Sequence, residues 1–193
     1  MKQKYVELAI RTEKVITEIK GIDYRLFHAS LGICTEVGEL YHNKLNPTLL
    51  RDQKVNLSEE LGDVFWYLAI AYDTLNLDFS ETVKQNLDLG IDLDFVNPTS
   101  EFFLDNLCIR SADLLDLFKK SIIYHKQFDF DFAIDIINDC LKLVISIIIL
   151  NELDINKILK TNIDKLTARY PDKFTSDKAI NRDLDAEHII LSA

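Results

Sequence analysis

Apolar residues recur at helical spacing along most of the chain, and this pattern constrains the fold more than any other feature. Near the start, Val6, Ala9, Ile10 and Ile16 share one helical stripe, and Gly21 is placed to end that helix. The same spacing predicts further helices at about 23–43, 56–75, 78–90, 100–125, 131–150 and 155–169. Alternating strand patterns are missing, so we expect an all-α helical bundle.

Two of the predicted helices start with a capping-box pattern, in which a polar residue precedes an acidic residue by three positions. Asn56 with Glu59 marks the start of the third helix, and Asp78 with Glu81 marks the start of the fourth, which Gly90 ends. Five glycines and three prolines in 193 residues leave little room for long irregular loops. The chain can therefore bury one substantial core with short connections.

Composition excludes several classes of function. The formal net charge of −10 argues against non-specific binding of nucleic acid, which requires a basic surface. The longest apolar run, residues 143–150, is too short to span a bilayer, and the first residues lack the apolar stretch of a signal peptide. Cys34, Cys108 and Cys140 lie within apolar helical patterns and are expected to be reduced core thiols. We expect a cytoplasmic protein without a membrane or nucleic-acid partner.

Two acidic pairs carry most of the chemical information. Glu36 and Glu39 lie in the second predicted helix, and Glu60 and Asp63 lie in the third. Each pair has i,i+3 spacing, which places both carboxylates on one helix face with Cβ atoms roughly 5–6 Å apart. If the two helices pack side by side, four carboxylates converge. Mg²⁺ prefers oxygen ligands of this kind, with water and substrate phosphates completing its shell.

The setting of Asp63 favours a metal site over a solvated acidic face. With 32 acidic residues in the chain, acidic pairs at this spacing also arise by chance. Residues 61–71, however, are apolar almost all round, which marks a buried helix. A buried carboxylate is costly unless it is paired or bound to metal. Glu59 and Glu60 could instead be first-turn acids that complement the helix dipole, but Asp63 is too far along the helix for that role.

The second half of the chain looks like a degenerate copy of the first, with chance alignment of amphipathic helices as the alternative. A shift of 76 residues aligns 77–87 with 153–163. This shift pairs Lys84 with Lys160, Asn86 with Asn162, and Asp63 with Asp139. A shift of 77 pairs Glu36 with Asp113 and Glu39 with Asp116. Glu60 falls on Ile136, so the second half cannot rebuild the acidic set.

These residues resemble the MazG-like nucleotide pyrophosphohydrolases, part of the all-α NTP pyrophosphatase superfamily. The family pattern is an E-E-x-x-E element followed by an E-x-x-D element on the next helix. Glu36 and Glu39 match the first element and, after 20 intervening residues, Glu60 and Asp63 match the second. Thr35 departs from the fuller pattern, which has a glutamate there. Residues 26–32 and the C-terminal stretch 162–187 also resemble phage and bacterial members.

The resemblance implies an enzyme that uses Mg²⁺, with Mn²⁺ able to substitute, to convert a nucleoside triphosphate to a monophosphate and pyrophosphate. Water attacks the α-phosphorus, and the four acids are metal ligands and catalytic residues. It also implies that the family's two-protomer bundle is fused in one chain. Residues 1–92 would form the catalytic half and residues 99–193 the degenerate half, packed into one domain. Association of two such chains into a homodimer stays open, as does the preferred base or sugar.

Polyphosphate also requires cationic or amide partners. Lys44, Arg51 and Lys54 lie in or beside the connection between the two acidic helices. Lys84 and Asn86 lie on the next helix, where similar positions in the family contact phosphate. For each cation, the alternative is a solvated surface charge. We expect Lys54, Lys84 and Asn86 to contact substrate.

Aromatic residues near the acids are further candidates for substrate contacts. Tyr67 follows Asp63 by four residues, so its hydroxyl could reach a phosphate or a metal-bound water, with a core aromatic as the equal alternative. Trp66 and Phe27 could stack on a base, although core packing is the favoured alternative for both. His28 lies on nearly the same helical meridian as Glu39 and is expected to approach substrate, with a structural histidine at a helix start as the alternative.

Two other functions are weighed against this one. Glu39 and His42 form an E-x-x-H pair like those of di-iron bundles, but such bundles require a second pair from another helix. His125 has Ile122 at the required position, so it does not supply one. The other alternative is a non-catalytic regulatory module that binds nucleotides without turning them over. The complete four-acid set argues against it.

Overall fold

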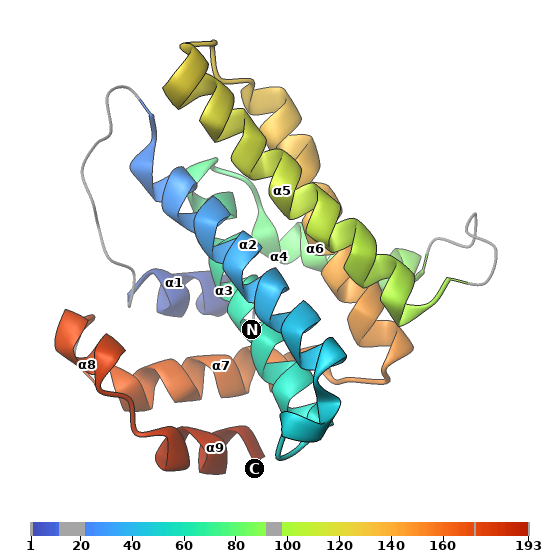
Figure 1. The fold of residues 1–193 in the computed structure, drawn as a ribbon, viewed down its shortest axis with the longest axis vertical. Helices are drawn as coiled ribbons and strands as arrows, with labels where there is room; N and C mark the ends of the chain where they lie inside the picture. Colours follow the sequence, from blue (N-terminus) through green and yellow to red (C-terminus); the bar gives the residue numbers. More distant parts are fainter. Residues whose placement is uncertain (1, 12–21, 92–97, 172, 193) are drawn as a thin grey trace.

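Helices make up the regular structure of the computed structural model, which describes residues 2–11, 22–91, 98–171 and 173–192 (Figure 1). They are α1 (Lys2–Ile10), α2 (Tyr24–Leu45), the short 3-10 helix η1 (Pro47–Leu49), α3 (Gln53–Thr74), α4 (Phe79–Leu89), α5 (Ser100–Tyr124), α6 (Phe130–Leu150), α7 (Ile155–Arg169), α8 (Ser176–Ile180) and α9 (Leu184–Ser192). These residues contain no β-strand. The predicted all-α class is therefore confirmed. The expected end of the first helix at Gly21 lies outside the described residues.

Aspartate side chains fix where several helices start. The carboxylate of Asp23 accepts hydrogen bonds of 2.9 and 3.0 Å from the backbone N–H groups of the second and third residues of α2. Asp78 accepts one of 2.9 Å from the backbone N–H of Glu81. Gly90 ends α4 with a φ of 70°, a conformation that glycine adopts without strain. The predicted boundaries of this fourth helix are confirmed.

The predicted start of the third helix is wrong by about one turn. Asp52, rather than Asn56, caps α3, and its carboxylate accepts hydrogen bonds of 2.9 and 3.0 Å from the second and third helical residues. Asn56 consequently lies inside the helix. Glu59 and Glu60 therefore lie beyond the first turn, where the helix dipole no longer explains them.

Two antiparallel hairpins of helices form the body of the structure (Figure 1). The first consists of α2 and α3, the second of α5 and α6, and α5 lies along α2. The helix that follows each hairpin packs on the second helix of the other hairpin: α4 packs on α6 as well as on α1, and α7 packs on α3. Residues of the expected second half are thereby brought against the acidic helix of the first half.

The core lies between these hairpins. The predicted burial of the two most apolar segments is confirmed. In 61–71, Leu61, Val64, Phe65 and Leu68 have no exposed surface. In 143–150, four apolar residues of α6 are buried. Full burial of each such side chain stabilises the folded state by about 1.5–3 kcal/mol. The one face of α3 that keeps partial exposure in this segment carries Asp63, Trp66 and Tyr67.

No helix in the described residues combines the length and apolar character needed to cross a membrane. The three cysteines are unbonded, as predicted. Cys140 is buried, whereas Cys34 and Cys108 are only partly buried. Burial raises the pKa of the Cys140 thiol to about 12, so this thiol stays protonated and unreactive near neutral pH.

Candidate functional site

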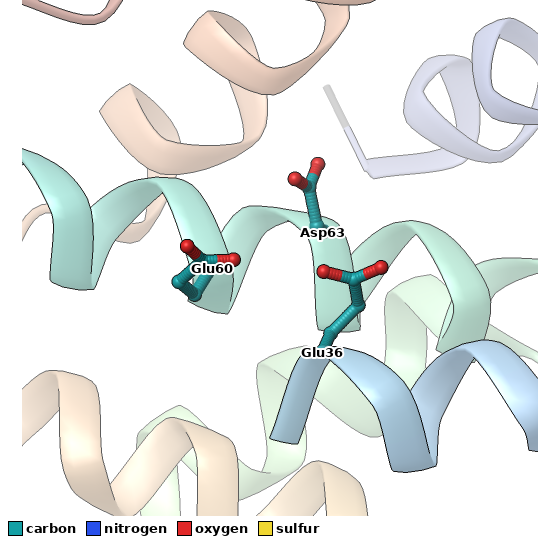
Figure 2. Close-up of side chains that lie close together, drawn as sticks. All are labelled: Glu36, Glu60 and Asp63. Atoms are coloured by element: carbon teal, nitrogen blue, oxygen red, sulfur yellow. The ribbon is translucent and has the colours of Figure 1, made fainter. Parts of the chain in front are cut away.

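Three of the four predicted acids converge where α2 packs against α3. Glu36 comes from α2, and Glu60 and Asp63 come from successive turns of α3 (Figure 2). Each offers a carboxylate oxygen, and these oxygens lie within 4.8 Å of one another. Oxygens bound to one Mg²⁺ lie at most about 4.2 Å apart, because each is about 2.1 Å from the ion. Small side-chain movements therefore suffice for these residues to share an ion.

Glu39 lies outside this group of three. It is exposed, although it faces the same cavity one turn farther along α2. Glu59 joins the acids instead, since it is partly buried and also lines the cavity. The site therefore contains a close group of three of the four expected acids, with the fourth, Glu39, and the additional Glu59 at its edge.

Like charges and burial perturb two of these acids. The pKa of Glu36 rises from 4.5 to about 8, through burial and then through the charges of Asp63 and Glu39. The pKa of Glu60 also rises to about 8, through burial and then through Asp63, Glu39 and Glu59. Without a cation, these carboxylates oppose one another's ionisation. A divalent ion would relieve this repulsion, so the donor set fits a hard cation.

A cavity of about 380 Å³ lies in front of the acids. Its lining combines acidic, aromatic and cationic side chains from α2, α3 and the C-terminal segment: His28, Glu36, Glu39, Glu59, Glu60, Asp63, Trp66, Tyr67, Leu166, Arg169, Tyr170, Phe174 and Arg182. The predicted candidates His28, Trp66 and Tyr67 are therefore at the site. The cavity is not confined to the expected catalytic half, because five of its residues follow residue 160.

Helix α7 fixes the orientation of Asp63. The side-chain amide of Asn162 donates a 2.6 Å hydrogen bond to one carboxylate oxygen, and Lys165 Nζ lies 2.6 Å from the other. Lys165 also lies 3.2 Å from Glu59, and its side chain is only 1% exposed. Burial lowers the pKa of Lys165, but Asp63 and Glu59 outweigh burial and raise it. Asn162 is oriented in turn by a 3.0 Å hydrogen bond from the hydroxyl of Tyr5.

These contacts from α7 were missed in the sequence, although a signal was present. The shift of 76 residues pairs Asn86 with Asn162, and of these two residues Asn86 is the one that the sequence predicts at the substrate. In the structure, Asn86 donates to the backbone oxygen of Thr82 within α4, while Asn162 contacts Asp63. The two asparagines differ because α4 packs on α6 and α1, whereas α7 packs on α3 and reaches the acids.

The remaining predicted cations also lie away from the cavity. Lys84 is exposed on α4, and Lys54 borders a different depression near the start of α7. Lys44 forms a 2.5 Å ion pair with Glu101. Lys54, Lys84 and Asn86 are thus not brought to the acids, and their expected contacts with substrate are not supported by their positions.

Two glycines permit close approaches that build the site. A Cβ atom on Gly32 of α2 would lie 2.1 Å from the Tyr67 ring, so only glycine lets that ring lie across α2. A Cβ on Gly62 would lie 3.2 Å from the Cβ of Asn162, so glycine also allows α7 to approach α3 closely. Both residues adjoin the acidic elements in sequence and position side chains of the cavity.

Aromatic rings form one wall of the site. The ring of His28 lies edge-on to that of Tyr67, with ring centroids 5.7 Å apart. The rings of Trp66 and Tyr67 are also edge-on, with centroids 4.7 Å apart. The indole N–H of Trp66 donates a 3.1 Å hydrogen bond to the backbone oxygen of Ala9, which ties α1 to this wall. Burial and then the charge of Glu36 raise the pKa of Tyr67, so its hydroxyl remains protonated.

Phe27 does not contribute to this wall. Its ring packs against Phe118 with centroids 5.0 Å apart. Phe27 thus packs against the core, which was the favoured alternative.

The matching positions in the second hairpin are arranged differently. Arg110 lies 3.5 Å from Asp113 and 2.8 Å from Asp139, which are the counterparts of Glu36 and Asp63. Asp116 pairs with lysines of its own helix. Ile136, at the counterpart of Glu60, is fully buried. One guanidinium thus bridges the two carboxylates here and offsets part of their charge, and the third oxygen ligand is missing.

The di-iron alternative finds no support in the geometry. His42 is exposed on α2, and the group of clustered ligands found in the described residues consists of carboxylates alone. A ligand set made only of oxygens suits Mg²⁺ or Mn²⁺. A di-iron site of the kind considered would also require histidine nitrogen ligands.

Comparison of the chain with protein-family models, with curated proteins and with solved structures finds no match.

Proposed function

We propose that the protein is a divalent-metal-dependent nucleoside triphosphate pyrophosphohydrolase, which converts a ribo- or deoxyribonucleoside triphosphate to the monophosphate and pyrophosphate. The observation that carries this proposal is the convergence of Glu36, Glu60 and Asp63 from two adjacent helices in one cavity. The raised pKa values of Glu36 and Glu60 support it, because they mark carboxylates whose buried negative charge is not fully compensated by the protein.

The residues of the cavity suit the separate requirements of this reaction. Glu36, Glu60 and Asp63 would hold Mg²⁺, which supplies charge neutralisation on phosphate oxygens and lowers the pKa of a bound water. Asn162 and Lys165 keep the Asp63 carboxylate oriented toward its neighbours. Glu39 adds a further carboxylate at the exposed edge. The site offers no cysteine nucleophile among its lining residues, in keeping with direct attack by water.

The aromatic wall suits the nucleoside end of the substrate. Trp66, Tyr67 and Tyr170 line the cavity together with Phe174, and aromatic rings stack readily on nucleobases. Arg169 and Arg182 line the same cavity and provide positive charge at its edge, with Arg182 Nη2 4.0 Å from Glu59. One cavity thus contains acidic, cationic and aromatic surfaces, which are the three chemistries that a metal-bound nucleoside triphosphate requires.

The fold supports a fusion of two homologous halves of the NTP pyrophosphatase type. The two hairpins are consecutive in sequence, and the helices that follow them, α4 and α7, pack on α6 and α3 respectively. On this view one chain completes one site, because α7 of the second half supplies Asn162 and Lys165 to the acids of the first.

The proposal is tested by incubating the purified protein with a panel of ribo- and deoxyribonucleoside triphosphates and Mg²⁺. We expect monophosphate and pyrophosphate as products for at least one substrate. Glu60→Gln should remove most of the rate, because it removes a metal ligand. Release of orthophosphate and a diphosphate would show attack at the γ-phosphorus and contradict the proposal. Tight binding without turnover would instead support the non-catalytic nucleotide-binding alternative.

A further inference from the structure

The C-terminal segment brings two guanidinium groups to the edge of the acidic cavity. Arg169 ends α7, and Arg182 lies between α8 and α9. Both side chains converge on Glu187 of α9, a helix that packs on α7 and also contacts α3. The three residues form a cluster, called here the arginine clasp, that is continuous with the cavity but separate from the close group of Glu36, Glu60 and Asp63.

The clasp has well-defined hydrogen bonds. Arg169 donates to the two carboxylate oxygens of Glu187 from Nε at 2.7 Å and from Nη2 at 2.6 Å. Arg182 donates to one of these oxygens from Nε at 3.2 Å and from Nη2 at 2.7 Å. These bonds use the same edge of each guanidinium, and Nη1 of each takes no part in them. Glu187 is only 4% exposed.

The charges of the clasp do not cancel. Burial alone would raise the pKa of Glu187, but the hydrogen bonds and charges of the two arginines outweigh it and lower the pKa to about 2. One anion therefore faces two cations at neutral pH. Arg182 Nη2 lies 4.0 Å from Glu59, a distance longer than its contacts with Glu187. The clasp thus keeps positive charge beside a cavity whose other charged wall is acidic.

This arrangement exceeds what is needed to attach α9 to the body. One bidentate pair between Arg169 and Glu187 already joins α7 to α9. Arg182 adds a second cation, with its side chain 38% exposed, while that of Arg169 is 14% exposed. Lys165 differs, because its ion pairs are with acids of the cavity itself. A planar guanidinium with an available edge is well suited to phosphate oxygens.

We propose that Glu187 is a positioning residue that presents Arg169 and Arg182 to the polyphosphate chain of the substrate, at the end distant from the acidic group. This inference rests on the proposed function for the identity of the substrate. It assigns to the C-terminal segment, beyond α7, a direct part in recognising the phosphates that leave as pyrophosphate.

Calorimetric titration with inorganic tripolyphosphate in millimolar Mg²⁺ tests the inference without requiring turnover. Arg182→Gln should weaken binding about tenfold, because a charge-assisted contact is lost. Glu187→Gln should also weaken binding by at least about fivefold, although it makes the protein more positive. Without the carboxylate, Arg169 and Arg182 are no longer held in the orientation that meets the phosphates. Lys178→Gln is the matched control, since it removes one exposed cation of α8 that does not line the cavity. It should leave binding unchanged.

Steady-state kinetics and unfolding separate positioning from a purely structural role. In Arg182→Gln and Glu187→Gln, KM for the nucleoside triphosphate should rise while kcat stays within several-fold, and Arg182→Lys should restore part of the loss. Circular dichroism melting shows at which temperature each variant is folded, and all assays are run below it. Arg182 is partly exposed, so Arg182→Gln tests the inference even if Glu187→Gln unfolds.

Three results overturn the inference. The first is unchanged tripolyphosphate affinity in Arg182→Gln, and the second is tighter binding in Glu187→Gln, which would show that net charge alone matters. Normal turnover with unchanged KM in both variants would also overturn it while leaving the proposed hydrolase intact. Clasp-dependent tripolyphosphate binding without any nucleotide turnover would support the clasp and contradict the hydrolase.

Discussion

Raising the pH should destabilise the metal-free protein through Glu36 and Glu60. Both have a pKa raised from 4.5 to about 8 in the folded state, chiefly by burial and by the neighbouring charge of Asp63. The folded state therefore retains protons that the unfolded chain releases. Stability is lost as the pH rises from about 4.5 to about 8, and the loss is complete above the folded-state pKa.

The size of the effect follows from the shifts. Within that window, each group lowers the free energy of unfolding by about 1.4 kcal/mol for every pH unit. For a chain of this size, 1 kcal/mol corresponds to about 2–4 °C in melting temperature. One of these glutamates should therefore lower the melting temperature by about 3–5 °C per pH unit, and the pair by up to twice that amount.

Thermal unfolding followed by circular dichroism between pH 5 and 9, with a chelator present, measures this slope. Glu60→Gln should remove about half of it, and combining that change with Glu36→Gln should remove nearly all of it. Glu7→Gln, which removes an exposed carboxylate of α1, is the control and should keep the slope of the unaltered protein. If the double variant keeps the full slope as well, the acidic group is not the source of the pH dependence and the reasoning fails.

Mg²⁺ should flatten the same slope, because it binds the deprotonated carboxylates of the folded state. At a hundredfold excess over its dissociation constant, an ion that binds only the folded state stabilises by about 2.7 kcal/mol. This corresponds to a rise of roughly 5–10 °C in melting temperature. Melting curves at pH 8 with and without the ion measure the rise. Identical curves, together with a lower melting temperature in the double variant, would show that these acids are not a metal site.

Three further predictions concern single residues. Lys165→Met should lower the free energy of unfolding by about 3–5 kcal/mol at pH 8, because it leaves the carboxylates of a buried ion pair uncompensated. Chemical denaturation measures the loss, and a variant as stable as the original protein would contradict the prediction. Gly32→Ala should displace the ring of Tyr67 and cost about 1–3 kcal/mol, with a shift in tyrosine absorbance, and an unperturbed spectrum would show that the ring has not moved. Asp63→Asn should abolish turnover, whereas Asp139→Asn should leave it within several-fold, and equal losses in kinetic assays would mean that the second hairpin has a working site.

The helices that the sequence predicts well are those with strong local signals. Residues 131–150 and 155–169 were expected within a residue of α6 and α7, because apolar periodicity and an aspartate before each start are local properties. The start of α3 was missed because Asp52 precedes a polar first turn, where hydrophobic periodicity has not begun. Helices α8 and α9 were not expected at all. The position of α9 depends on contacts such as that of Glu187 with Arg169, which local patterns do not reveal.

The candidate site divides in the same way. Helical spacing placed Glu60 and Asp63 on one face of α3 and predicted that Glu36 would meet them. The contacts of Asn162 and Lys165 join positions about a hundred residues apart in the chain, so they depend on which helix crosses to α3. Sequence repetition identified the equivalent positions on α4 and α7 but could not tell which of the two helices reaches the acids.

Binding of Mn²⁺ measured by electron paramagnetic resonance tests the central claim most directly, because it counts bound ions without requiring a substrate. We expect at least one bound ion that is lost when Glu36→Gln and Asp63→Asn are combined. The matched control combines Asp113→Asn and Asp139→Asn, the pair that Arg110 bridges, and it should bind as the unaltered protein does. Equal binding in the two double variants, or no binding in the unaltered protein, would contradict a metal site between α2 and α3.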